Sequence, residues 1–213
     1  MEAPIRVEER LLTAEEFYDL YAGQNFELVR GKVVDAQSGL PISEWYTRTA
    51  EAFGMPVAAE AMTSPIHGLL QSRLSALLEN YLAGNPVGKA VANTGFILRR
   101  NPDITRAPDV AFIAANQIES HPIPERGFWE VTPDLAVEIV SPDDRADAVA
   151  EKVQEYLRAG VRLVWVIYPR QRQIYRFRPA GHGTAVEDAD TLSGGDVLPG
   201  FELALHQLWS VLD

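Results

Sequence analysis

Two charged residues interrupt apolar patterns in the second half of the chain. Glu138 lies within the strand-like segment 135–140 (LAVEIV), and Lys152 lies on the apolar side of a helical pattern further along. A carboxylate or an ammonium group in such a place is unfavourable by several kcal/mol unless it is paired or binds a metal. We therefore expect both side chains to take part in chemistry. For Lys152 the alternative is that its stem packs while its ammonium group reaches water.

A third acidic residue, Asp109, precedes the apolar segment 110–113. Pro108 before it suits the first position of a strand, where the missing N–H of proline is tolerated. Asp109 would then lie at a strand end, where functional residues are common. Its carboxylate would join that of Glu138 and the amine of Lys152.

Two carboxylates and an amine predict a site for Mg²⁺ or Mn²⁺, because hard cations prefer oxygen ligands. In phosphodiester hydrolysis such a metal polarises the phosphate and lowers the pKa of a bound water. A nearby lysine can orient that water and offset the charge that develops on the phosphoryl oxygens. The four histidines are scattered, which disfavours a histidine-rich zinc site.

Three further residues could line this site. Glu27 lies in the first strand of a hairpin and is a fourth candidate carboxylate, although a solvent-facing strand residue is the alternative. His67 lies in the first turn of a helix near its buried face, as either a structural histidine or a site residue. Tyr156 lies one turn after Lys152 on the same side of its helix.

The surrounding sequence predicts alternating strands and helices. Thr13 and Glu16 form a capping-box pattern, Ser64 and Pro65 begin a helix that ends at Gly84, and Ser141 or the aspartates after it could cap the next helix. We expect helices at 13–20, at 64–84, from a cap within 141–144 to 160, and at 206–211, and strands at 26–29, 32–34, 91–98, 110–113, 135–140, 163–168 and 173–177. The strand–helix–strand order from 135 to 168 favours a parallel pair. The fold class is therefore α/β, with a central mixed β-sheet flanked by helices.

Composition limits the classes of protein that the chain could be. With 213 residues, 46% of them hydrophobic, it can form a single domain over 1–213, in which 36–64, with a short helix at 44–53, is interpreted as an insertion. The absence of cysteine excludes disulfides and thiolate metal sites. No signal peptide and no run of about 18 apolar residues is visible. We expect a cytoplasmic protein with no membrane role.

The quoted residues together resemble a known family. Asp109 follows Pro108, Glu138 lies in the segment 133–142 (PDLAVEIVSP), and Lys152 lies four residues before Tyr156. This pattern is similar to the Uma-two family of restriction-endonuclease-like proteins, a branch of the PD-(D/E)XK nuclease superfamily. The resemblance covers most of the chain, including 26–31 and 198–200. It implies a restriction-endonuclease-like core.

The resemblance also implies roles for individual residues. Asp109 and Glu138 would bind the metal, the carbonyl of Ile139 would add a ligand, and Glu27 would join from the N-terminal strand. Val140 stands where the superfamily signature has a lysine. Lys152 would supply the amine from the following helix instead.

The leading hypothesis is thus a metal-dependent DNA endonuclease, for which a homodimer would suit the cutting of two strands. The alternatives are a non-catalytic nucleic-acid-binding or assembly module on a nuclease scaffold, and a hydrolase of a non-nucleic phosphoester. The net charge of −11 disfavours broad binding of nucleic acid. Local contacts to DNA phosphates are therefore assigned to Arg99, Arg100 and Arg106, whose hairpin leads into Asp109.

Overall fold

The computed structural model describes residues 10–44, 64–179, 183–186 and 191–213. Its largest element is a six-stranded sheet in the order β10-β9-β8-β7-β6-β3, beside a four-stranded sheet in the order β2-β1-β5-β4 and the pair β11-β12. The strands are β1 (Phe26–Val29), β2 (Lys32–Asp35), β3 (Gly88–Ala92), β4 (Phe96–Arg99), β5 (Ile104–Arg106), β6 (Val110–Ala114), β7 (Leu135–Ile139), β8 (Leu163–Tyr168), β9 (Gln173–Phe177), β10 (Thr184–Val186), β11 (Thr191–Ser193) and β12 (Glu202–Ala204).

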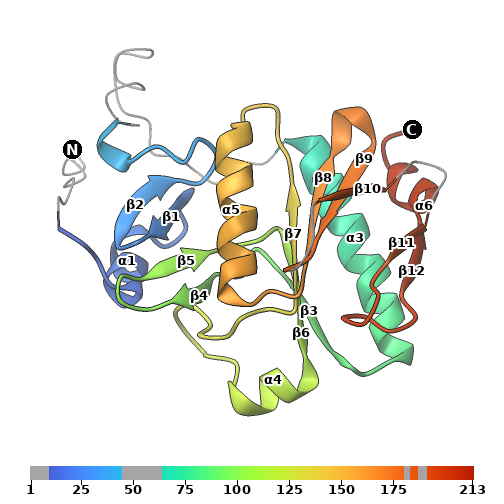
Figure 1. Cartoon of the computed structure of the whole chain (residues 1–213), viewed down its shortest axis with the longest axis horizontal. Helices are drawn as coiled ribbons and strands as arrows, with labels where there is room; N and C mark the ends of the chain where they lie inside the picture. Colours follow the sequence, from blue (N-terminus) through green and yellow to red (C-terminus); the bar gives the residue numbers. More distant parts are fainter. Residues whose placement is uncertain (1–9, 45–63, 180–182, 187–190) are drawn as a thin grey trace.

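Helices cover the sheets and fill the space between them. They are α1 (Ala14–Tyr21), α3 (Pro65–Gly84), α4 (Ala115–Ser120), α5 (Ala146–Ala159) and α6 (Leu205–Trp209), with a 3₁₀ turn at Pro169–Gln171. In Figure 1, α5 lies between the four-stranded sheet and strands β7 and β8, while α3 lies behind the large sheet. The helix α5 therefore borders both sheets, which places its side chains at their junction.

The two faces of the large sheet bury different hydrophobic clusters, because successive side chains of a strand point to opposite sides. Val110 and Val137 pack with α3 and α6. Ala111 and Ala136 face the other way and pack with the buried side of α5. By the same alternation, Glu138 belongs to the face that α5 covers.

Most of the expected elements are present. The capping box of Thr13 and Glu16 is complete, and the oxygen of Ser64 accepts the N–H of His67 at the start of α3. Strands β7 and β8 are parallel, whereas β8 and β9 form the expected antiparallel hairpin. The mixed α/β fold is therefore confirmed.

Two local predictions are wrong. The expected strand at 91–98 is divided between β3 and β4, which belong to different sheets. Asn93 has a φ of 47° at the break, and a Cβ on Gly95 would lie 2.2 Å from the ring of Phe128. A turn with tight packing thus interrupts what hydropathy alone predicts as one strand.

The second wrong prediction concerns the start of α5. The carboxylate of Asp144 does not cap this helix, because it accepts the N–H of Ser141 at 2.7 Å.

The expected helix at 44–53 and most of the interpreted insertion at 36–64 lie outside the described residues. Within the described part of the chain, no helix has both the length and the apolar character needed to cross a membrane.

Candidate active site

The sheet register brings Asp109 and Glu138 together. Val110 of β6 is the antiparallel partner of Val137 in β7, so the next position along this register places Asp109 opposite Glu138. The side chain of Glu138 then points toward α5, two positions from Ala136 in the same strand. At the end of the pair, the Oδ2 atom of Asp109 accepts the backbone N–H of Ile139 at 2.6 Å.

The helix α5 supplies the two groups that bind Glu138. The ammonium group of Lys152 donates to Oε2 of Glu138 at 3.3 Å, and the hydroxyl of Tyr156 donates to Oε1 at 2.6 Å. Residues four apart lie on the same side of a helix, which explains why both reach one carboxylate. The prediction that Lys152 points inward holds, because its side chain is only 13% exposed.

Burial makes this carboxylate unusual. Removal from water, together with the charges of Asp109 and Glu27, raises the pKa of Glu138 to about 7 despite the lowering effects of Lys152 and Tyr156. Burial alone would lower the pKa of Lys152, yet the carboxylates of Glu138 and Glu27 raise it above its usual value. The site therefore keeps a charged lysine beside a carboxylate that an additional cation would help to ionise.

His67 holds the other carboxylate. Its Nε2 atom lies 3.0 Å from Oδ1 of Asp109, and the side chain is only 6% exposed. Burial lowers the pKa of His67, but the hydrogen bond and the charge of Asp109 outweigh it and raise that pKa overall. The Nδ1 atom is buried with no hydrogen-bond partner among the described residues. The first turn of α3 thus orients Asp109 through His67.

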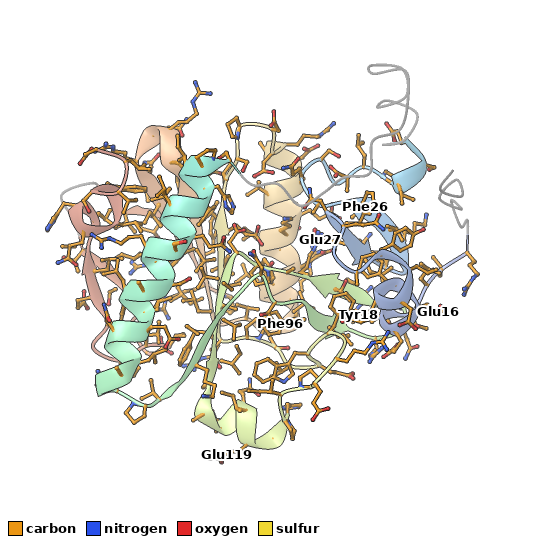
Figure 2. All side chains as sticks on the ribbon, turned by 180° about the vertical axis from the view of Figure 1, so that it is seen from behind. Glu16, Tyr18, Phe26, Glu27, Phe96 and Glu119 are labelled. Carbon is orange, nitrogen blue, oxygen red and sulfur yellow. The ribbon has the colours of Figure 1, made fainter. Side chains whose placement is uncertain are left out.

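Glu27 reaches the same cluster from the small sheet. It is buried, and its carboxylate contacts the guanidinium group of Arg106 and lies 3.7 Å from the ammonium group of Lys152. In Figure 2, Glu27 lies on β1 beside α5. The alternative that Glu27 faces solvent is therefore wrong.

A cavity of about 340 Å³ opens onto these groups. Its polar lining includes Asp109, Glu138, Lys152, His67, Glu27 and Asp144. Sequence analysis interpreted Asp144 only as a capping candidate. In the structure it lines the cavity, and burial raises the pKa of its carboxyl group. Its position just after β7, where the chain leaves the sheet beside the site, could have indicated a site residue.

The side chains at the cavity suit a divalent cation. Among the described residues, no group of three or more histidine, cysteine or acidic side chains is arranged to hold a metal by side chains alone. Mg²⁺, however, commonly uses one or two carboxylates and completes its shell with water. The lining holds four carboxyl groups, of Glu27, Asp109, Glu138 and Asp144, against the ammonium group of Lys152 and the imidazole of His67. This imbalance favours an added cation at Asp109 and Glu138, with Ile139 on the same cavity wall.

Two of the three arginines assigned to DNA phosphates are neutralised within the chain. Arg106 is 4% exposed, and its charge is taken up by the carboxylates of Glu27 and Glu155. The guanidinium group of Arg100 binds three carboxylates. They belong to Glu15, Asp103 and Glu130. Of the three arginines, only Arg99 remains exposed with no ion pair among the described residues.

Comparison with known proteins gives the family of a chain with this fold and with this cluster at the ends of β6 and β7. A family model described as "Uma2: Putative restriction endonuclease" matches residues 47–206. The chain therefore belongs to the Uma2 family, which confirms the resemblance. No curated protein matches the chain.

A solved structure gives independent support for the fold. It is described as a "putative nuclease belonging to DUF820" from Anabaena variabilis, and it is similar to this chain with a TM-score of 0.71 at 18% sequence identity. The similarity covers 95% of this chain and 99% of that chain. The restriction-endonuclease-like architecture is thus shown, and family membership supports nuclease activity.

Proposed function

We propose that the protein is a metal-dependent DNA endonuclease that hydrolyses phosphodiester bonds. One observation carries the proposal: Asp109 and Glu138 lie opposite each other at one cavity, with the ammonium group of Lys152 3.3 Å from Glu138. Buried charges without a structural need usually belong to functional sites. Membership in the Uma2 family agrees with this chemistry.

Asp109 and Glu138, with the carbonyl of Ile139, would hold Mg²⁺ or Mn²⁺. When bound, the cation would polarise the scissile phosphate and lower the pKa of a water molecule. Lys152 would donate a hydrogen bond to the attacking water and offset the negative charge that develops on the phosphoryl oxygens. These are the two roles that its position on the cavity wall allows.

The remaining side chains position this machinery. Tyr156 holds one oxygen of Glu138, and His67 holds one oxygen of Asp109. Glu27 lies 3.7 Å from Lys152 and keeps the ammonium group charged and directed toward the cavity. Partners of this kind commonly change metal affinity by about 10- to 100-fold when they are removed.

The test is a nuclease assay of the purified protein on single-stranded, duplex and branched DNA with Mg²⁺ or Mn²⁺, and with EDTA. Glu138→Gln is the matched control, since it keeps the shape of the side chain and removes its charge. We expect metal-dependent cleavage by the wild type and none by the variant. Equal cleavage by both proteins would show that a contaminant or another site is responsible.

A non-catalytic module on a nuclease scaffold is the second candidate, and the net charge of −11 favours it. Calorimetric titration with Mn²⁺ separates the two. The endonuclease predicts binding that Glu138→Gln abolishes without unfolding the chain, whereas the module predicts no metal binding by either protein. A homodimer would suit the cutting of two strands and stays a prediction. Sedimentation analysis of the purified protein would test it.

A further inference from the structure

Two more cavities lie along α5, next to the candidate active site. One, of about 220 Å³, is lined by Arg30, Lys32 and Lys152 among others, and it shares Lys152 and Ala36 with the active-site cavity. The other, of about 250 Å³, is lined by Arg30, Arg99 and Arg158 among others. Because the two cavities share Arg30, we treat them as one feature, the α5 groove.

One side of α5 forms the length of this groove. Its residues there are Ala148, Glu151, Lys152, Glu155, Arg158 and Ala159. These positions follow the three- and four-residue spacing of one helix face. At 1.5 Å per residue, the face extends about 16 Å, which is long enough to lie beside several phosphates of one DNA strand.

The cations of the groove differ from the other arginines near the site. Within the described ranges, Arg30, Lys32 and Arg99 form no ion pair, and all three are exposed. Arg158 is also exposed and bonds only the amide oxygen of its neighbour on the helix, Gln154, at 3.0 Å. Their charges are thus available to a ligand.

The acidic residues of the groove do not neutralise these cations. Glu155 is buried and is bound by Arg106. Glu151 is exposed on the same side of α5, and it is the one other carboxylate that the described lining contains. Four cations against one free carboxylate give a local positive surface in a chain whose net charge is −11.

We propose that the α5 groove binds the sugar–phosphate backbone of DNA beyond the scissile phosphate, through Arg30, Lys32, Arg99 and Arg158. This inference rests on the proposed endonuclease function and assigns its DNA-binding surface. The strand would pass from the active-site cavity to the groove at Lys152, which lines both. Phosphate contacts of this kind carry affinity without reading sequence.

The test compares two double variants that remove the same charge. Arg30→Gln/Arg158→Gln removes one cation from the β1–β2 turn and one from α5. The control, Lys89→Gln/Arg176→Gln, removes two cations that form no ion pair in the part of the chain that the structure describes. In the β-sheet, Lys89 of β3 lies opposite Ile113 of β6, and Arg176 of β9 lies opposite Trp165 of β8. Lys89 therefore lies toward the end of the sheet away from Glu138, and Arg176 lies on the face of the sheet that α3 covers, opposite the face that carries Glu138.

Binding of a fluorescent DNA duplex is measured over a series of salt concentrations, with Ca²⁺ replacing Mg²⁺ to prevent cleavage. Each lost phosphate contact lowers the slope of log K against log salt by about 0.9. The groove variant should lose about two units of slope and about 50-fold in affinity at 0.1 M salt, by the same relation. The control should stay within about threefold of the wild type.

Each outcome decides at least one of the two claims, the groove and the endonuclease. A groove variant that binds like the control overturns the groove while leaving the endonuclease intact, provided that the wild type cleaves DNA. A wild type that binds DNA through the groove without cleaving it overturns the endonuclease alone. A wild type that neither binds nor cleaves DNA overturns both. If the double variant unfolds, Arg99→Gln is used instead, with an expected loss of about one unit of slope.

Discussion

Arg106 and Lys152 are two buried cations that share the carboxylate of Glu27, but their surroundings differ. Arg106 is enclosed by the carboxylates of Glu27 and Glu155, which match the fixed fork of a guanidinium group. Lys152 lies at longer distances, 3.3 Å from Glu138 and 3.7 Å from Glu27, and it lines two cavities. The arginine has a complete set of partners, whereas the lysine can still meet a substrate. This difference separates a structural ion cluster from a candidate catalytic one.

Removing Arg106 should have the largest effect on stability. Arg106→Met leaves Glu155 without a cationic partner among the described residues, and breaking a buried ion pair in this way costs about 3–5 kcal/mol. Urea unfolding measures the loss. The double variant Arg106→Met/Glu155→Gln should recover part of it, because the unpaired charge is then removed. Wild-type stability in Arg106→Met would mean that the cluster does not hold the four-stranded sheet against α5.

Lys152→Met should have the opposite balance, with a small change in stability and a large loss of turnover. Lys152 is the main charge that lowers the pKa of Glu138, so in the variant Glu138 would take up a proton instead of staying an unpaired anion. Loss of one preorganised electrostatic group lowers turnover by about 10²- to 10³-fold. Single-turnover cleavage and urea unfolding check the two halves of this prediction. A variant that cleaves DNA like the wild type would show that Lys152 is structural, as Arg106 is.

Tyr156→Phe tests how far the positioning of Glu138 matters. The hydroxyl bond at 2.6 Å lowers the pKa of Glu138, so its removal should let protons compete better with a metal. We expect Mn²⁺ affinity to fall by about tenfold, the lower end of the range for such partners. The loss should be larger at pH 6 than at pH 8, because a group with a pKa near 7 is mostly protonated only at the lower pH. An equal loss of Mn²⁺ affinity at both pH values would mean that Tyr156 fixes the geometry of Glu138 without affecting its protonation.

The sequence predicted the elements, and the grouping of Asp109, Glu138 and Lys152, for identifiable reasons. Periodicity revealed Glu138 and Lys152 because each one interrupts a local apolar pattern within its own strand or helix. The parallel β7–α5–β8 unit then follows from connection rules, and it brings the two residues together. Asp109 was found through its position before a strand. Local pattern and topology were sufficient here.

Charge patches were harder to predict, since they depend on partners far away in the chain. Arg99 and Arg100 are neighbours, and local sequence gives no reason to separate them. In the structure, Arg100 binds Glu15 and Glu130, which lie 85 and 30 residues away. The α5 groove is likewise assembled from the β1–β2 turn, β4 and α5. Apart from Arg30 and Lys32, its cations are far apart in sequence, so they form no recognisable cluster.

Arg99 and Arg100 therefore give the smallest but most selective comparison. Arg100→Gln removes a partly exposed cation that binds three carboxylates. We therefore expect a loss of about 1 kcal/mol in stability, with unchanged DNA binding. Arg99→Gln removes an unpaired cation of the α5 groove, so stability should hold while the salt slope of DNA binding falls by about one unit. Urea unfolding and salt-dependent binding in Ca²⁺ are measured on both variants. If Arg100→Gln weakens DNA binding and Arg99→Gln does not, the assignment of free and neutralised arginines is reversed and the DNA path must follow β4 on its other side.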